Sequence, residues 1–248
     1  MNALATRYLD AAIDLLGRVR DEEATAIDKA ARLIAEAVAD RKRVFAFGCT
    51  HSALPVQDLV YRAGGLMLVN PIFGPGITAL DVRPPTLTSA MEKLEGYAEV
   101  LLDSSPAEAG DVLIVVSVSG RNAVPIEMAQ LAAARGLVVV AVTSRAYSDS
   151  VTSRHPSGKK VHDFAHVVLD NKVDPGDAVL DAEGVPQRFC PASGVTSTAL
   201  LHALVAATIE HLLTLGVTPP VYLAANVDGG AEYNAALLAE HRDRIFYL

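Results

Sequence analysis

Two spacings of hydrophobic residues along the chain separate helical segments from buried strands. Residues 3–19 and 22–40 repeat apolar positions with the period of an amphipathic helix, which predicts a pair of helices at the N-terminus. Residues 111–117 (DVLIVVS) and 137–144 (LVVVAVTS) are instead continuously apolar. Such runs are typical of strands covered on both faces of a parallel sheet. The pattern therefore predicts a helical pair followed by a region built around a buried sheet.

Shorter segments continue an alternation of strands and helices. Further strands are predicted at 43–48, 66–70 and 166–171, and further helices from about residue 52 and over 88–103, 123–136, 195–215 and 230–242. The stretches 70–89 and 172–194 are too rich in proline, glycine and polar residues for regular structure. We expect an α/β fold, a doubly wound, parallel five-stranded sheet with the N-terminal helical pair and a C-terminal extension.

The chain has 248 residues, a length that one α/β domain accommodates. No internal repeat, low-complexity tract or linker divides it. We therefore expect a single domain over 1–248, with N-terminal helices at 1–40, a core at 41–216 and a C-terminal extension at 217–248.

The balance of charge narrows the class of partner. The formal net charge is −8, which argues against nucleic acid as a partner because phosphate backbones require a surface rich in lysine and arginine. A local cationic pocket for a small anion remains compatible with this charge.

Cysteine use and hydropathy indicate a cytoplasmic protein without a membrane span. The two cysteines, Cys49 and Cys190, form no CxxC motif, so we expect neither a disulfide framework nor a metal site, and we expect no cofactor. Charged residues interrupt the N-terminal helix, which therefore lacks the apolar core of a signal peptide. The apolar stretch 198–216 contains His202 and Glu210, which favours a buried helix over a membrane helix.

Polar clusters follow the predicted strands at the point where each one ends. After the first strand come Gly48, Cys49, Thr50, His51 and Ser52; after later strands come Ser117, Ser119, Gly120, Arg121 and Asn122, then Thr143 and Ser144, then Asp170 and Asn171. The carboxyl ends of parallel strands meet at one edge of a sheet, where ligands bind. Hydroxyl groups and free backbone N–H groups at helix N-termini bind anions, phosphate above all. The alternative for each residue is an ordinary helix N-cap.

Known nucleotide-binding loops do not match these turns. Neither GxxxxGK[ST] nor GxGxxG is present, which disfavours a nucleotide ligand.

The motifs "FGCTHS" and "VVSVSGRNAVPIEMAQLAAARGLVVVAVTS" resemble the sugar isomerase (SIS) family, a phosphosugar-binding domain with a flavodoxin-like sheet, over roughly residues 30–215. More narrowly, segments such as "YRAGG" and "AANVDGGAEYNAALL" resemble a stand-alone bacterial SIS group. The resemblance implies that Ser52, Ser117 and Ser119 hold the phosphate. It also implies at least a homodimer with the site at the interface.

Three positions of these turns leave alternatives open. Asn122 stands where the family pattern has threonine or serine, and its amide could donate to the phosphate instead. Thr50 stands where the family's second glycine usually falls, so its Cβ could crowd the turn. Arg121 could pair with the phosphate or point to solvent.

The chemistry of a sugar phosphate requires a general base, usually a carboxylate or a histidine. Glu95 is our first candidate because "EGYAE" resembles the "EGAED" stretch of the etherase that acts on N-acetylmuramic acid 6-phosphate, where the glutamate is thought to work in acid/base catalysis. The alternative for Glu95 is a solvated helix face. His51 could be an acid/base group or a cationic phosphate ligand.

Further polar residues are candidates for contacts with the sugar. Asn70 and Asn171 at strand ends could bind sugar hydroxyls or an N-acetyl group, and Thr143 shares this edge. Asn226 and Glu232 belong to a polar loop before the last helix, which could be a lid over the pocket or an ordinary turn.

These observations favour an enzyme that acts on an amino-sugar 6-phosphate, with N-acetylglucosamine 6-phosphate as the first candidate. Glu95 would remove the proton next to the open-chain aldehyde, and the enolate would lose the 3-substituent, as in a lyase or dehydratase. Reprotonation at C1 would instead make the protein an isomerase. A phosphosugar sensor without turnover is the alternative from another class.

Overall fold

The computed structural model of the protein describes residues 3–78 and 81–248. Its centre is a parallel sheet in the order β2-β1-β3-β4-β5. These strands are β1 (Val44–Gly48), β2 (Val69–Ile72), β3 (Val112–Val116), β4 (Val138–Thr143) and β5 (Val167–Asp170). Every residue of β1 and β3 is buried, as the continuous apolar runs predict. The prediction of a doubly wound five-stranded sheet is confirmed.

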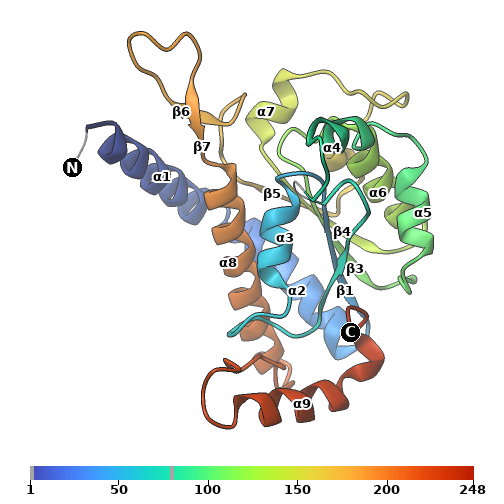
Figure 1. Ribbon diagram of the computed structural model, residues 1–248. Coiled ribbons are helices and arrows are strands. Elements are labelled where there is room, and N and C mark those ends of the chain that lie inside the picture. The colour runs from blue at the N-terminus through green and yellow to red at the C-terminus, as the bar shows by residue number, and fades with distance from the viewer. Residues whose placement is uncertain (1–2, 79–80) are drawn as a thin grey trace.

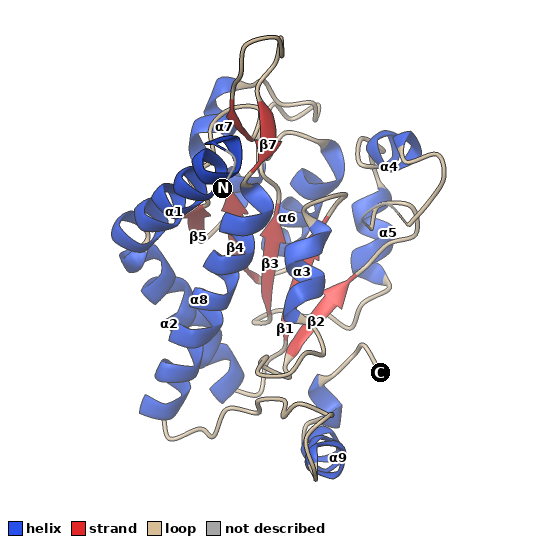
Figure 2. Cartoon of the chain, turned by 60° about the vertical axis from the view of Figure 1, so that its left-hand side comes forward, coloured by secondary structure: helices blue, strands red, loops and turns tan. Residues whose placement is uncertain are grey.

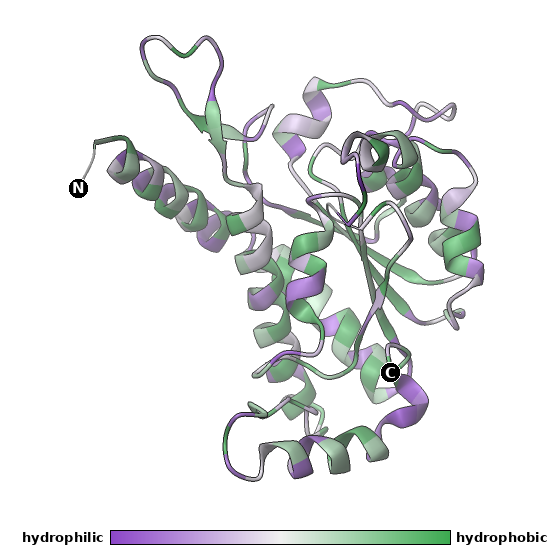
Figure 3. Cartoon of the chain, in the orientation of Figure 1, coloured by the Kyte–Doolittle hydropathy of each residue, from purple (hydrophilic) through white to green (hydrophobic). Residues whose placement is uncertain are grey.

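Helices cover both faces of this sheet (Figure 1, Figure 2). The helices are α1 (Ala3–Glu22), α2 (Ala24–Ala39), α3 (Ala53–Leu59), α4 (Thr86–Met91), α5 (Tyr97–Asp103), α6 (Ala123–Ala134), α7 (Arg145–Ser150), α8 (Ser193–Thr214) and α9 (Gly230–Glu240), with 3-10 turns η1 (Val161–Phe164) and η2 (Arg242–Arg244). Apolar residues of α2, α3 and α8 form one core with the sheet, and those of α5 and α6 form a second core on its other face. Figure 3 shows the central strands in the colours of hydrophobic residues.

Two elements project from the body beside each other: α1, and a hairpin of β6 (Ala178–Leu180) and β7 (Phe189–Pro191) (Figure 1). Packing between α1 and β6 joins them. The hairpin lies within the stretch 172–194, for which no regular structure is predicted. Its strands have three residues each, too few to show an alternating pattern in the sequence.

The prediction of one helix over 88–103 is wrong. The structure has two helices there, α4 and α5, separated by a turn at residues 92–96. Gly96 has φ +81°, a left-handed conformation that ends a helical path and that glycine adopts without strain.

The second strand is also displaced from its predicted position of 66–70. It spans Val69–Ile72, so Asn70 lies near its beginning and not at its carboxyl end. The residues before it, Leu66 and Met67, instead pair with the C-terminal extension near Val221. Figure 1 shows that extension, with α9, at the end of the sheet opposite to the β6–β7 hairpin.

Among the described residues, α8 is the one helix whose length and composition would suit a membrane span. Its Leu200, Leu201 and Leu204 are at most 1% exposed and belong to the core that α8 shares with α2 and the sheet. This packing is what we expect of the central helix of a globular core.

Candidate functional site

A pocket of about 650 Å³ opens at the carboxyl ends of β1 and β3. It is lined by the turn after β1, the turn after β3, Glu92, Tyr147 and the base of the β6–β7 hairpin with the start of α8. The sequence-predicted residues that it brings together are Thr50, His51, Ser52, Ser117, Ser119 and Asn122. Position and lining agree with the expectation that ligands bind beyond the carboxyl ends of parallel strands.

The turn after β1 is tightly folded. A Cβ on Gly48 would collide with the carbonyl group of Ser52, so glycine is required for the chain to turn back at this point. Thr50 has φ +54°, a left-handed conformation that costs a threonine about 1–2 kcal/mol. The resemblance noted above has glycine at this position, and the structure shows why: the backbone here is left-handed. This chain adopts that conformation with threonine. Ser52 precedes α3, but its side chain does not cap that helix. Its hydroxyl is therefore available to a ligand in the pocket that Ser52 lines.

The turn after β3 places two serines at the pocket wall. Ser117 is 5% exposed at the end of β3, and Ser119 follows it half-buried. Gly120 has φ +60°, and a Cβ there would lie 3.2 Å from the Oγ of Ser148. Gly120 thus shapes the turn without lining the pocket. Arg121 also lies outside the lining; its Nη2 is 3.4 Å from the Oγ1 of Thr152.

Two carboxylates line this pocket, Glu92 and Asp177, and Asp177 is already engaged by the N–H groups of Ala192 and Ser193 and by the Ser193 hydroxyl. Glu92 is therefore the carboxylate available to a ligand. It follows the last residue of α4, and its side chain is half-buried beside Asn122. Burial raises the pKa of its carboxyl group above the ordinary value, and a hydrogen bond from the Asn122 amide and the charges of Lys93 and Arg154 act in the opposite direction. A carboxylate with a raised pKa in a pocket is suited to take up and return protons.

Glu95 is exposed and does not line the pocket. It lies in the turn between α4 and α5, just before the left-handed Gly96. The continuous helix assumed from the sequence would have given Glu95 and Glu92 neighbouring places on one face. The turn separates them instead, and it leaves only Glu92 at the pocket.

Asn122 begins α6, but its side chain does not cap that helix. Its Oδ1 accepts a hydrogen bond from Arg154 at 3.0 Å. Its amide group faces Glu92 and lowers the pKa of that carboxyl group. Ser144, by contrast, is an ordinary N-cap whose Oγ accepts from the backbone N–H of Tyr147. The capping interpretation thus holds for Ser144 and does not hold for Ser52 or Asn122.

The opposite wall of the pocket comes from residues that the sequence analysis did not single out. Asp177 accepts hydrogen bonds from the backbone N–H groups of Ala192 and Ser193 and from the hydroxyl of Ser193, which fixes the base of the hairpin to the start of α8. Val195 of α8 and Tyr147 of α7 complete this wall. No local motif marks these residues, because they come together only through the fold.

The remaining sequence-predicted residues lie away from the lining. Asn70 is fully buried, donates from Nδ2 to the Arg244 carbonyl at 2.9 Å and accepts at Oδ1 from the Phe246 N–H at 2.6 Å. It therefore anchors the C-terminal segment. Asn226 and Glu232 are exposed at the end of the sheet opposite the pocket, in the extension that carries α9 (Figure 1).

Two buried strand-end residues support the site from behind. The Thr143 hydroxyl donates to the carbonyl of Val118, the residue between the two pocket serines. The Asn171 amide donates at 2.9 Å to the Oγ of Ser197, which lines the pocket. Both side chains are fully buried, so they act on the lining and do not form it.

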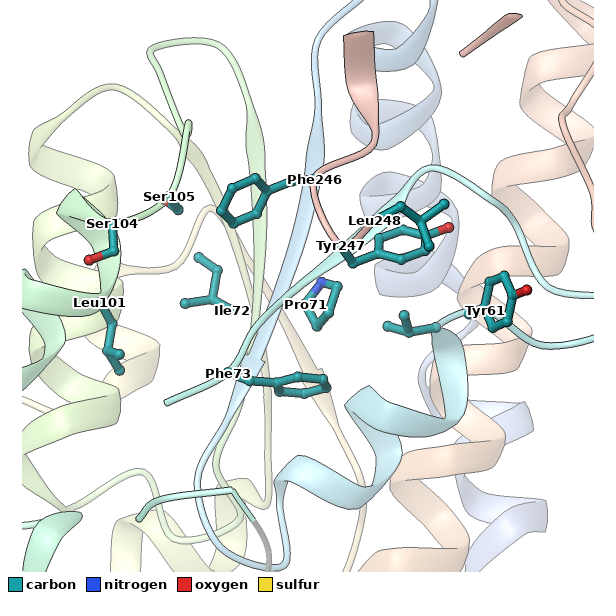
Figure 4. A pocket seen from close by; sticks show the side chains of 11 residues that line it. Tyr61, Pro71, Ile72, Phe73, Leu101, Ser104, Ser105, Phe246, Tyr247 and Leu248 are labelled. Atoms are coloured by element: carbon teal, nitrogen blue, oxygen red, sulfur yellow. The ribbon is translucent and has the colours of Figure 1, made fainter. Parts of the chain in front are cut away.

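A second pocket, of about 550 Å³, lies between β2 and the C-terminal residues (Figure 4). Tyr61, Phe73, Phe246 and Tyr247 give it an aromatic lining, and its other polar side chains are Ser104 and Ser105. Its lining has neither an acidic side chain nor the strand-end turns. The first pocket is therefore the candidate functional site.

A buried thiol lies beside the site. Cys49 is 1% exposed, and burial, followed by the charge of Glu92, raises the pKa of its thiol, which keeps it protonated. Within the described residues, no group of three or more histidine, cysteine, aspartate or glutamate side chains is arranged to hold a metal ion.

Comparison with known proteins agrees with this geometry. The family model of the SIS domain matches residues 7–144, a segment that includes both strand-end turns and Glu92. A protein of Streptomyces griseus, named only as a UPF0309 protein, is 52% identical over 98% of this chain and 97% of its own length.

Solved structures share the fold at low identity. Phosphoheptose isomerase GmhA from Neisseria gonorrhoeae is 20% identical, with a TM-score of 0.55 over 84% of this chain and 97% of that one. The Vibrio vulnificus NanR protein, solved in complex with ManNAc-6P, is 15% identical, with a TM-score of 0.53 over 87% of this chain and 68% of that one. Since the family model covers more than half of the sequence and the Streptomyces relative almost all of it, the chain belongs to the SIS-domain family and, within it, to the UPF0309 group.

Proposed function

We propose that the chain binds an amino-sugar 6-phosphate in the pocket at the ends of β1 and β3 and removes a proton from its sugar with Glu92. The observation that carries this proposal is the presence of a half-buried carboxylate, with a raised pKa, in the same pocket as the strand-end hydroxyls. A phosphate-binding wall and a base in one cavity of about 650 Å³ suit a substrate of the size of a sugar phosphate.

The phosphate would bind at the two turns. Ser52, Ser117 and Ser119 supply hydroxyl donors on one wall of the pocket. Asn122, which we also expected to touch the phosphate, is engaged with Arg154 and Glu92. We therefore propose that Asn122 orients the base, Glu92, and does not contact the phosphate. His51 is exposed and belongs to the pocket lining, and we assign it as the proton donor to the leaving group.

Proton removal by Glu92 begins the reaction. In the open-chain aldehyde, the proton on C2 is acidified by the adjacent carbonyl group, and Glu92 accepts it. The electron pair passes to the carbonyl oxygen as an enolate and returns to form the C2–C3 double bond as the C3–O bond breaks. The departing hydroxyl takes up a proton and leaves as water, so sugar phosphate is converted to dehydrated sugar phosphate plus water with no redox change.

The nitrogen at C2 favours elimination over isomerisation. An aldose becomes a ketose when the C2 oxygen becomes a carbonyl group and C1 gains a proton. With an acylated nitrogen at C2, the same proton shift would give a C2–N double bond, which is no ketose. Loss of the C3 hydroxyl is therefore the outcome that fits N-acetylglucosamine 6-phosphate. The NanR protein, a structure that shares the fold, was solved in complex with ManNAc-6P, an N-acylated sugar phosphate, and this supports that choice.

An aldose-ketose isomerase is the second candidate, because the structure of Neisseria phosphoheptose isomerase shares the fold. Its substrate would carry oxygen at C2, and Glu92 would return the proton to C1. Binding without turnover is the third candidate.

Mass spectrometry of N-acetylglucosamine 6-phosphate incubated with the purified protein tests the proposal. Loss of one water from the sugar phosphate, absent with Glu92→Gln, is the expected result. An unchanged mass together with an altered NMR spectrum would establish epimerisation at C2 instead, because this sugar forms no ketose; the aldose-ketose candidate is tested in the same way with a sugar phosphate that carries oxygen at C2. If both spectra remain those of the starting sugar while the ligand still raises the melting temperature, the protein is a binding protein and the enzymatic assignment fails.

We further propose that the protein is a cytoplasmic homodimer or higher oligomer. The projecting α1 leaves Leu9 49% and Ile13 64% exposed, an apolar surface that a second subunit would cover. Light scattering after size exclusion gives the oligomeric state, and Ile13→Glu should lower it if α1 lies in the interface.

A further inference from the structure

We propose that Arg154 is a positioning residue: through the side chain of Asn122 it holds the Glu92 carboxylate toward the pocket. The catalytic consequence of this inference rests on the proposed function, whereas the positioning itself does not.

A continuous series of contacts joins the three side chains. The Nη1 of Arg154 donates to the Oδ1 of Asn122 at 3.0 Å. This bond fixes which end of the Asn122 amide faces the guanidinium group, so the NH₂ end remains to donate to Glu92, which lines the same pocket and whose pKa Asn122 lowers. An amide held at its oxygen can present its donor to only one place. Arg154 thereby sets the orientation of the group that orients the carboxylate.

Backbone contacts hold the three parent segments together around the first turn of α6. The Arg154 N–H donates to the carbonyl of Arg121 at 2.7 Å, which docks the loop 151–160 beside Asn122. The N–H of Val124 donates to the Glu92 carbonyl at 3.1 Å, which docks the end of α4 on the same turn. Backbone hydrogen bonds therefore hold the segments of Arg154 and Glu92 beside Asn122, whatever the conformation of the long arginine side chain.

A second link ties the same loop to the turn after Glu92. Both carboxylate oxygens of Glu127, on α6, accept from the N–H of Gly96, at 3.1 and 2.9 Å. The Nε2 of His155, next to Arg154, lies 3.6 Å from the same carboxylate. Glu127 of α6 is thus contacted both by the loop that carries Arg154 and by the turn between α4 and α5.

The charges around Glu92 make the effect of Arg154 measurable. Lys93 beside it in sequence and Arg154 across from it favour the ionised carboxylate, Cys49 lies behind it, and His51 shares the pocket. Burial opposes ionisation. Removal of Arg154 takes away one of the two cations and frees Asn122 to rotate, and both changes disfavour the ionised form.

The test is a ¹³C NMR titration of the Glu92 carboxyl group, identified by its loss from the spectrum of Glu92→Gln. We expect Arg154→Gln to raise the titration midpoint of Glu92 by about 0.5 to 1 unit. Asn122→Ala should raise the midpoint as well, since it removes the donor itself. Arg154→Lys should raise the midpoint less than Arg154→Gln does, because it keeps the charge without the planar guanidinium donor. Lys159→Gln is the matched control, since it removes one positive charge from an exposed side chain of the same loop. Its midpoint should equal that of the native protein.

An unchanged midpoint in Arg154→Gln, or an equal shift in Lys159→Gln, would overturn the inference, because the effect would then be absent or a matter of net charge. If the native protein turns over the substrate, the acid limb of its kcat/KM profile should move with the NMR midpoint in Arg154→Gln. If the midpoint moves and no phosphosugar is turned over by the native protein, the positioning stands and the enzymatic proposal fails.

Discussion

Glu92 and Glu95 form a natural pair for testing which carboxylate acts as the base. Both become glutamine without a change of size, and both lie within one short segment. Glu92→Gln keeps an oxygen that can accept the hydrogen bond from Asn122, so the pocket should keep its shape while the proton acceptor is lost. Glu95→Gln changes an exposed side chain in a turn outside the pocket.

The expected magnitudes follow from these surroundings. Loss of a positioned general base lowers the rate by about 10²–10⁴-fold. At about 1.36 kcal/mol for each factor of ten, the barrier rises by about 2.7–5.4 kcal/mol in Glu92→Gln. Glu95→Gln should remain within about twofold of the native rate, since surface substitutions of this kind change free energies by only about 0.5 kcal/mol.

The pH dependence of kcat/KM is a second test of Glu92 as the base. Glu92 accepts a proton only when it is ionised, so kcat/KM should fall as the pH decreases through its pKa. Because burial raises that pKa, the fall should begin at a higher pH than a glutamate with the ordinary value of 4.5 would give.

The assay follows disappearance of N-acetylglucosamine 6-phosphate by NMR for the native protein and both variants, over a range of pH. Binding of the sugar phosphate to each variant, measured by calorimetry, is the control for an intact pocket. A Glu95→Gln protein without activity beside a fully active Glu92→Gln protein would refute the assignment and would return the role of base to the residue first chosen from the sequence.

Three further predictions concern phosphate binding, the stability that Asn70 gives to the fold, and the stability lost by burying the ionised Glu92. Ser119→Ala should weaken sugar-phosphate binding by about tenfold, the loss of one hydrogen bond to a charged group, with kcat little changed. Asn70→Ala should lower the free energy of unfolding by about 2–4 kcal/mol in urea titrations, because it leaves the carbonyl of Arg244 and the N–H of Phe246 without their partner, and should not alter sugar-phosphate affinity. Glu92→Gln should melt at a higher temperature than the native protein at pH 7. A carboxyl group whose folded-state pKa is raised stabilises the fold below its unfolded pKa and loses that contribution as the pH rises through the folded value, so the advantage of the variant should vanish toward pH 4.

The sheet and the location of the site follow from local features of the sequence. Runs such as Val112–Val116 and Val138–Thr143 are apolar at nearly every position, which leaves few alternatives to a strand covered on both faces. A parallel arrangement then gathers the residues after each strand at one edge. This reasoning needs no knowledge of side-chain contacts, and it correctly brings Ser52 and Ser117 into one pocket.

The choice among similar polar residues depended on backbone details that the sequence does not show. A single left-handed residue, Gly96, divides the predicted helix and separates Glu95 from Glu92. A shift of the second strand to Val69–Ile72 moves Asn70 from the carboxyl end to the beginning of that strand. In both cases the residue type was suitable for a site, and a break in one helix or a shift of two to three residues in one strand decided where it lies. The hairpin wall with Asp177 could not be foreseen, because its contacts join positions far apart in the sequence.

The turns of the pocket contain features that lower stability when no ligand is bound. Thr50 adopts a left-handed backbone that costs about 1–2 kcal/mol, the Ser52 hydroxyl does not cap its helix, and burial opposes the ionisation of Glu92. Each feature would be selected against in a turn that served the fold alone, since an alternative such as glycine at position 50 would relieve it. A ligand that uses these groups should therefore stabilise the protein strongly, by about 2.7 kcal/mol at a concentration of one hundred times its Kd. The same reasoning predicts that Thr50→Gly stabilises the free protein, whereas Ser144→Ala, at the strand-end position where the hydroxyl does cap a helix, destabilises it.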